Sequence, residues 1–235
     1  MSHLGAALLL DFRLQERSKL YHIGVAVALL FGLACRVLVP EAYIGRVLCV
    51  YYLAAVGGTT YMFGASMVLF EKSERTLEAL RVSPMPATTY LASKALTLSA
   101  FGVVEALLVL AVAVRGAPVS PMPLVAGILV LGGLYTFVGV GQVATHDSVT
   151  GFIFPGALIV SLVLSIPFLY VLGVEPSLPI YLVPTQAPLL LILAAFEPIG
   201  AWQWIYALAV SLAGVGLAFA YALARFREHV RFGRA

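Results

Sequence analysis

Charged residues are scarce in this 235-residue sequence. Asp, Glu, Lys and Arg make up 11% of it, whereas hydrophobic residues make up 62%. Soluble domains of ordinary composition carry about 25% charged residues. A folded chain with so few charges lacks the polar side chains that would cover its surface in water. The shortage excludes an ordinary soluble protein and predicts an all-α integral membrane protein.

Several motifs that carry chemistry are also missing. The sequence contains neither a Gly-x-x-x-x-Gly-Lys-Ser/Thr phosphate loop nor a His-Glu-x-x-His pair, and it has no long run of Lys or Arg. Its two cysteines, Cys35 and Cys49, lack metal-type spacing, so free thiols are favoured over a disulfide. We therefore predict no catalytic residue, no bound metal or cofactor, and no nucleic-acid partner.

What the sequence does contain is long apolar runs. A helix needs about 20 mostly apolar residues to cross a bilayer, because its backbone groups must be satisfied within the segment. Six runs predict transmembrane helices, namely Leu20–Leu38, Ile44–Phe70, Tyr90–Val114, Pro123–Ala144, Gly151–Val174 and Ala201–Ala224. A shorter run, Leu189–Phe196, is flanked by prolines and predicts a re-entrant segment between the fifth and sixth spans.

The basic residues give the orientation. With both termini in the cytoplasm, only three of the 14 Lys and Arg residues, namely Arg36, Arg46 and Arg115, fall on the outer side. Cytoplasmic segments of membrane proteins are enriched in Lys and Arg. We therefore predict a multi-pass protein of the cell (plasma or inner) membrane with cytoplasmic N- and C-termini.

Residues 1–19 precede the first span and are predicted to form an N-terminal interfacial helix. Residues 20–235 then form the six-helix transmembrane domain. In a helix, Asp11 and Gln15 would lie on the same stripe as Leu4 and Leu8. Two polar side chains in an apolar stripe indicate either a contact with a protein partner or a tilted helix.

The loop between spans two and three carries a second polar pattern. Ser73 is a plausible N-cap, good helix formers follow, and Pro84 and Pro86 would stop the helix. The segment predicts a short charged cytoplasmic helix over residues 73–81, either a docking element for another protein or a solvated connector. The residues assigned to it are Ser73, Glu74, Arg75, Thr76, Leu77, Glu78, Leu80 and Arg81.

The order of these features resembles the ABC-2 type (type V) ABC exporter permeases. The similarity includes Glu-Arg-Thr-Leu-Glu-Ala-Leu after a long second span, then Ser-Pro-Met-Pro and a lysine at the start of the third. In that family, the helix corresponding to 73–81 is the coupling helix, which sits in a groove of the ATPase. The family's usual glycine before Thr-Leu-Glu is Arg75 in this chain.

The resemblance implies the rest of the machine. A permease of this family works as a dimer, with an identical copy or a paralogue, and two ABC ATPase subunits are docked below it. ATP and Mg would be bound by those separate subunits. Some drug-exporter permeases share the Asp-x-Arg-Leu-Gln pattern of residues 11–15. The resemblance therefore implies export of a hydrophobic or amphiphilic substrate, either a drug or a lipid-like molecule.

Glu105 is the one clear acid inside a predicted span, and an intramembrane charge marks a functional position by default. Together with Thr59 and Thr60, it is a candidate for the translocation path or a dimer contact, and the alternative is a packing residue hydrogen-bonded to Thr59 or Thr60. Phe154 and Phe168 of span five are candidate substrate contacts. A secondary carrier or channel-like protein without an ATPase is the other functional class that the sequence leaves open.

Overall fold

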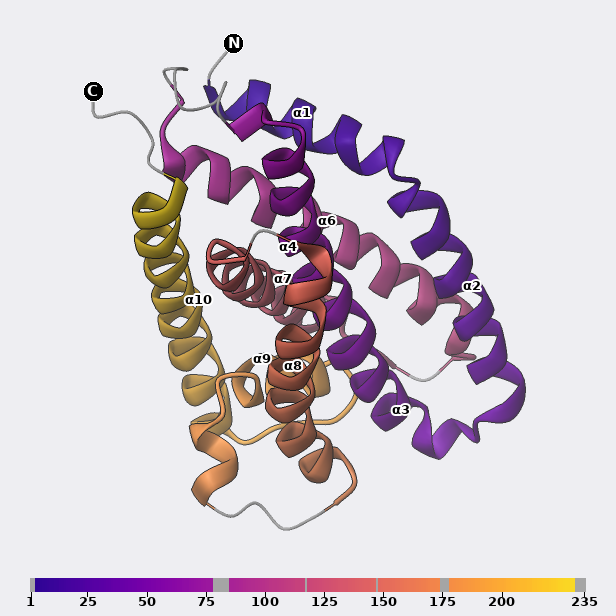
Figure 1. The fold of residues 1–235 in the computed structure, drawn as a ribbon. Coiled ribbons are helices and arrows are strands. Elements are labelled where there is room, and N and C mark those ends of the chain that lie inside the picture. Colours follow the sequence, from indigo (N-terminus) through magenta and orange to yellow (C-terminus); the bar gives the residue numbers. More distant parts are fainter. Residues whose placement is uncertain (1–2, 78–84, 117, 147, 174–177, 231–235) are drawn as a thin grey trace.

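The computed structural model describes residues 3–77, 85–116, 118–146, 148–173 and 178–230 of the chain. Every regular element within these residues is helical, as the sequence predicts for an all-α membrane protein (Figure 1). The principal helices are α1 (His3–Arg17), α2 (Leu20–Leu38), α3 (Ile44–Tyr51), α4 (Gly58–Ser73), α6 (Ala87–Ala113), α7 (Pro121–Val143), α8 (Val149–Val171), α9 (Gln186–Leu193) and α10 (Ala201–Val230).

Short helical pieces connect some of these elements. The 3-10 helix η1 (Glu41–Tyr43) leads into α3, and the π-helical η2 (Tyr52–Gly57) joins α3 to α4 without a break in the helix. A second 3-10 helix, η3 (Leu178–Leu182), precedes α9. Because π-helical turns inside long helices often occur at functional sites, η2 marks the middle of the second span for closer inspection.

The helices form a bundle around α7. In its most apolar 18-residue window, 72% of the α7 residues are buried, against 22% in the corresponding windows of α2 and α10. Figure 1 shows α7 in the middle of the bundle and α2 and α10 at opposite edges. Glycines allow this central position, because a Cβ at Gly139 would lie only 2.6 Å from the backbone oxygen of Tyr61. Of these three helices, α2 and α10 are therefore the ones most exposed at the surface of the bundle.

Among the described residues, five helices are long and apolar enough to cross a membrane. They are Leu20–Leu38, Glu41–Ser73, Ala87–Ala113, Pro121–Val143 and Ala201–Glu228. The first coincides with its predicted span, and the others extend beyond their predicted ends by a few residues on one or both sides. The fifth predicted span corresponds to α8, in which the shorter stretch Thr150–Ser161 is apolar. The count of six spans therefore stays a prediction.

The segment predicted to be re-entrant contains α9. All eight residues of α9 are buried, and the helix packs on α7, where a Cβ at Gly127 would meet the Ile192 backbone nitrogen at 3.0 Å. In Figure 1, α9 lies at the end of the bundle opposite α1. The helix begins at Gln186, three residues before the predicted Leu189, because it is stabilised by burial rather than by hydropathy alone. Its depth in the membrane stays a prediction.

The helix α1 lies across one end of the bundle, where α4 ends and α6 begins (Figure 1). The last turns of α10 reach the same end. This placement brings together polar residues from three segments that are far apart in the sequence.

Candidate functional site: a buried polar junction and an apolar pocket

Lys94 is the centre of a buried ion cluster. Its ammonium lies 2.9 Å from Asp11 Oδ1 and 2.7 Å from Glu71 Oε1, and its side chain is completely buried. The two acids come from α1 and α4, and the lysine comes from α6. A buried charge requires close partners, because burial removes it from water. These three residues therefore fix the relative positions of three helices.

Hydroxyl groups complete the cluster. Ser93 donates to Asp11 Oδ2 at 2.5 Å, and the Tyr90 hydroxyl donates to Glu71 Oε2. Lys94 also lies over the Tyr90 ring, 4.5 Å from its centroid. Each carboxylate oxygen thus has a donor, the arrangement that makes a buried ionic network rigid. We call these five residues, Asp11, Glu71, Tyr90, Ser93 and Lys94, the polar junction.

A second connection lies one turn further along α1. Gln15 donates from Nε2 to Thr97 Oγ1 at 2.8 Å and accepts at Oε1 from the Tyr21 hydroxyl at 2.7 Å. Gln15 is buried, as is Asp11. Both side chains are thus paired inside their own chain, and the predicted contact with a protein partner stays a prediction. The apolar stripe of α1 faces α6, and the two polar groups meet polar residues there.

The predicted coupling helix begins differently from the expectation. Ser73 is the last residue of α4, and its hydroxyl donates to Phe70 O at 2.8 Å, so it is not the N-cap of a new helix. Arg75 has φ of 57°, a left-handed conformation that ends α4. The break arises from this backbone turn, which residue propensities at Ser73 do not show.

The residues that follow this turn connect it to Glu71 of the polar junction. Thr76 Oγ1 donates to Glu71 O at 3.0 Å, and the Leu77 side chain is buried. Glu74 and Arg75 are exposed at the tip. Of the remaining residues assigned to the coupling helix, Glu78, Leu80 and Arg81 lie outside the described residues. The glycine expected from the family resemblance falls at Arg75, where the backbone adopts a conformation that glycine takes easily.

Lys72 forms another link that the sequence did not indicate. Its ammonium donates to Ala144 O and His146 O, both at 2.8 Å, just past the end of α7. The last carbonyls of a helix lack partners within the helix, and a lysine can satisfy them. Lys72 thereby joins the end of α4 to the end of α7. Lys72 was assigned from the sequence to a charge-rich loop, where a charged side chain is expected to be solvated. The contact with α7 was therefore not predicted.

Glu105 is buried against α3. It accepts a hydrogen bond from the Tyr51 hydroxyl at 2.9 Å, and the Tyr51 ring stacks on Phe31 with a centroid distance of 3.9 Å. Thr60, one of the predicted alternative partners, instead donates its hydroxyl to the carbonyls of Val56 and Gly57 in the same continuous helix. Tyr51 could have been suggested as a partner, because it is a tyrosine in the second apolar run and Glu105 lies in the third.

The residues predicted to line a translocation path or to contact the substrate differ in exposure, and their role stays a prediction. Glu105 and Thr60 are buried, Thr59 is partly buried, and Phe154 is 77% exposed. Phe168 packs partly against the core. Both native cysteines are free and buried, in agreement with the sequence-based expectation of free thiols.

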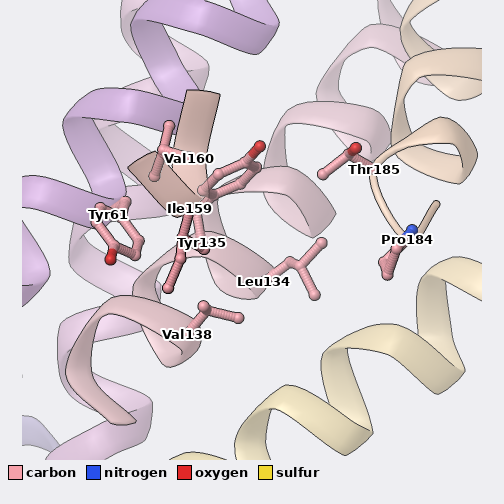
Figure 2. Close-up of a pocket in the computed structure, with 8 residues that line it drawn as sticks. All are labelled: Tyr61, Leu134, Tyr135, Val138, Ile159, Val160, Pro184 and Thr185. Carbon is pink, nitrogen blue, oxygen red and sulfur yellow. The ribbon is translucent and has the colours of Figure 1, made fainter. Parts of the chain in front are cut away.

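An apolar pocket of about 130 Å³ lies elsewhere in the bundle, between α4, α7 and α8 (Figure 2). Tyr61 forms one wall, fully buried, with its hydroxyl donating to Gln142. Its ring stacks on Phe152 at 5.6 Å and meets the Tyr135 ring edge-on at 6.4 Å. Among the described residues, the lining consists of Tyr61, Leu134, Tyr135, Val138, Ile159, Val160, Pro184 and Thr185.

A second, more polar groove of about 250 Å³ runs between α1 and α4, beside the polar junction. Arg17 and Glu74 are exposed side chains of opposite charge on its border, and Phe63 and Met67 are among its apolar walls. The groove ends at the turn that contains Glu74. A molecule bound there would therefore touch both α1 and the connection to α6.

These features define a multi-pass helical membrane protein in which a buried ion cluster lies at one end and an apolar pocket lies within the bundle. The chain belongs to the fluoroquinolones export permease protein family, whose model matches residues 2–232. It is similar to the fluoroquinolones export permease proteins of Mycobacterium tuberculosis strains CDC 1551 / Oshkosh and ATCC 25618 / H37Rv. Each is 33% identical over 209 residues, which cover 87% of this chain and 85% of the relative. Its family is thus one of transport permeases with an export role.

Proposed function

We propose that this chain is the transmembrane subunit of an ATP-binding cassette exporter of aromatic, amphiphilic drugs. A separate ATPase, present in two copies and carrying ATP and Mg, would supply the energy. A second permease, identical or paralogous, would complete a dimer. In this arrangement, the chain has six spans, with both termini in the cytoplasm.

The observation that carries the proposal is the position of the polar junction. Lys94 joins Asp11 and Glu71 immediately below the turn at Glu74 and Arg75. A force on that turn is transmitted to α1, α4 and α6 together, because a fully paired buried network resists deformation. A solvated connector needs no such attachment. This favours a docking role for residues 73–81 and a partner that pushes on them.

The drug class follows from the family. The relatives are named for fluoroquinolones, which are planar aromatic molecules with polar oxygens at one edge. The pocket between α4, α7 and α8 has two tyrosine rings in its lining, and its volume is about that of one aromatic ring. The pocket and the family name therefore support export of an aromatic drug over export of a lipid-linked glycan.

Crosslinking tests the docking role directly. Glu74 is exposed at the turn, and the native cysteines are buried, so a cysteine at position 74 is the reactive thiol. In membranes that contain the chain and its presumed ATPase, we expect Glu74→Cys to capture the ATPase. Glu197→Cys, exposed at the opposite end of the bundle, is the matched control and should capture nothing.

Transport in inverted vesicles tests the energy source. We expect accumulation of a fluoroquinolone to require ATP and to be abolished when the ATPase carries a substituted phosphate-loop lysine. Transport that persists with the inactive ATPase and collapses when the proton gradient is removed would instead indicate a secondary carrier. That result, together with no capture at Glu74→Cys, would overturn the proposal.

A further inference from the structure

The pocket between α4, α7 and α8 has the size of one aromatic ring. It encloses about 130 Å³, and most of its lining side chains are apolar or aromatic. For comparison, an apolar protein cavity of roughly 150 Å³ stays dry and binds benzene. A whole drug does not fit this volume. The pocket is therefore a subsite for one part of a larger molecule.

Tyr135 lines the pocket with its ring and carries a buried hydroxyl. The residue is 4% exposed, and its hydroxyl has no hydrogen-bond partner within the part of the chain that the structure describes. The other tyrosine of the lining differs, because Tyr61 already donates to Gln142. A buried hydroxyl that donates to nothing is destabilising, and such groups are uncommon in native proteins. An unsatisfied donor at an apolar pocket indicates a ligand that carries an acceptor.

The backbone holds this tyrosine in place. Gly57, in the π-helical η2, packs against its ring, and a Cβ there would lie 3.3 Å from Tyr135 Cε2. Figure 2 shows the Tyr135 ring reaching from α7 toward the segment of Pro184 and Thr185. The irregular turn and the glycine thus leave room for the ring without filling the pocket itself.

The pocket is accessible from outside the bundle. Ile159 and Pro184 of its lining are exposed, whereas Tyr61 and Tyr135 lie deep. A ring can therefore enter between α8 and the 184–185 segment while the rest of the molecule stays outside. The accessible surface of the lining is apolar, so the Tyr135 side chain must turn slightly for its hydroxyl to reach an acceptor, and that acceptor must lie on the leading ring.

We propose that this pocket is a drug subsite that binds one aromatic ring together with a carbonyl or carboxylate oxygen on it, and that the Tyr135 hydroxyl donates to that oxygen. The proposal rests on the proposed drug-export function and adds the recognition chemistry. A quinolone carries a ring carbonyl beside a carboxylate, so it presents hydrogen-bond acceptors at one edge of a planar bicyclic ring system. A lipid acyl chain has the apolar surface but no acceptor.

Binding to the purified full chain in lipid nanodiscs tests the proposal without an ATPase. The probes are a fluoroquinolone and its analogue without the ring carbonyl and carboxylate, each followed by its fluorescence anisotropy. We expect the wild type to prefer the fluoroquinolone. Tyr135→Phe should weaken fluoroquinolone binding about three- to tenfold, the size of one hydrogen bond, and leave the analogue unchanged.

Three further variants control this measurement. Tyr52→Phe removes a buried hydroxyl that donates to Ala106 O at 2.9 Å, outside the pocket, and should leave binding of both probes unchanged. Ile159→Trp closes the mouth and should weaken binding of both probes. Leu158→Trp, on the neighbouring exposed position of α8, should weaken neither.

Two results would overturn the inference. One is Tyr135→Phe binding both probes as the wild type does, and the other is Ile159→Trp leaving fluoroquinolone binding intact. Equal binding of both probes that a fatty acid displaces would identify a lipid site instead. These outcomes are separate from the proposed function, which fails when Glu74→Cys captures no ATPase even though the Tyr135 results hold.

Discussion

The polar junction and the apolar pocket differ in how their buried polar groups are paired. In the junction, three charged side chains and two hydroxyls satisfy one another completely. In the pocket, the Tyr135 hydroxyl is buried without a partner in the described structure. A satisfied network holds helices together, whereas an unsatisfied donor has capacity for a ligand. The difference separates a mechanical element from a recognition element.

Removing the centre of the junction should have the largest effect. Lys94→Ala leaves the buried Asp11 and Glu71 carboxylates without their shared cation, and breaking a buried pair costs about 3–5 kcal/mol. We expect a large fall in the melting temperature of the detergent-purified chain. Lys19→Ala, in an exposed position, should change it little. Equal melting temperatures for the two variants would show that the junction contributes nothing to stability.

A substitution at Glu105 should have an intermediate effect. Glu105→Ala removes the acceptor of the Tyr51 hydroxyl and leaves a small cavity, so we expect a loss of about 2 kcal/mol. Glu105→Gln retains an acceptor oxygen and should lose less than about 1 kcal/mol. If transport by Glu105→Gln falls sharply while stability is kept, the carboxylate acts in translocation or dimer contact rather than in packing.

Two tyrosine substitutions compare the satisfied and unsatisfied states directly. Tyr52→Phe deletes a made hydrogen bond and should destabilise the chain by about 1 kcal/mol. Tyr135→Phe deletes a buried hydroxyl without a partner and should be neutral or slightly stabilising in the absence of drug. The measurement is the thermal midpoint of each variant in detergent. A loss of stability in Tyr135→Phe as large as that in Tyr52→Phe would mean that its hydroxyl is satisfied.

The turn beside the junction should give the smallest effect. Arg75 adopts φ of 57°, which a residue with a Cβ takes at a cost of roughly 1 kcal/mol. Arg75→Gly should therefore raise stability by about 0.5–1 kcal/mol, less the backbone entropy that glycine loses. Arg75→Ala keeps the Cβ and serves as the control. A gain in the alanine variant as well would trace the effect to the arginine charge.

Much of the helical layout was predictable because its cause is local. Leu20–Leu38 is apolar enough to form a span wherever it lies, and α2 occupies those residues. The second apolar run forms one continuous helix, in which η2 leads directly into α4. The boundary between η2 and α4 was therefore not predictable from the sequence. Ser73 was predicted to begin a new helix, whereas it ends α4. The left-handed turn at Arg75 that follows leaves no clear mark in hydropathy.

The candidate site was predicted only in part. Asp11 and Gln15 were recognised as unusual polar residues in an apolar stripe, which indicated either an outside partner or a tilted helix. Their actual partners, Lys94 and Thr97, lie more than 80 residues away. Tyr135 was not singled out, because a tyrosine in an apolar run gives no sign of whether its hydroxyl is paired.

The sequence by itself determined the solvent, the helical class and the approximate extents of most long helices, because hydropathy and backbone satisfaction act over single segments. Only the tertiary structure decided which charges meet at Lys94 and that the Tyr135 hydroxyl lacks a partner among the described residues. Pairing of this kind depends on where separate helices pack. Side chains many residues apart become neighbours through packing alone, and their chemistry follows from it.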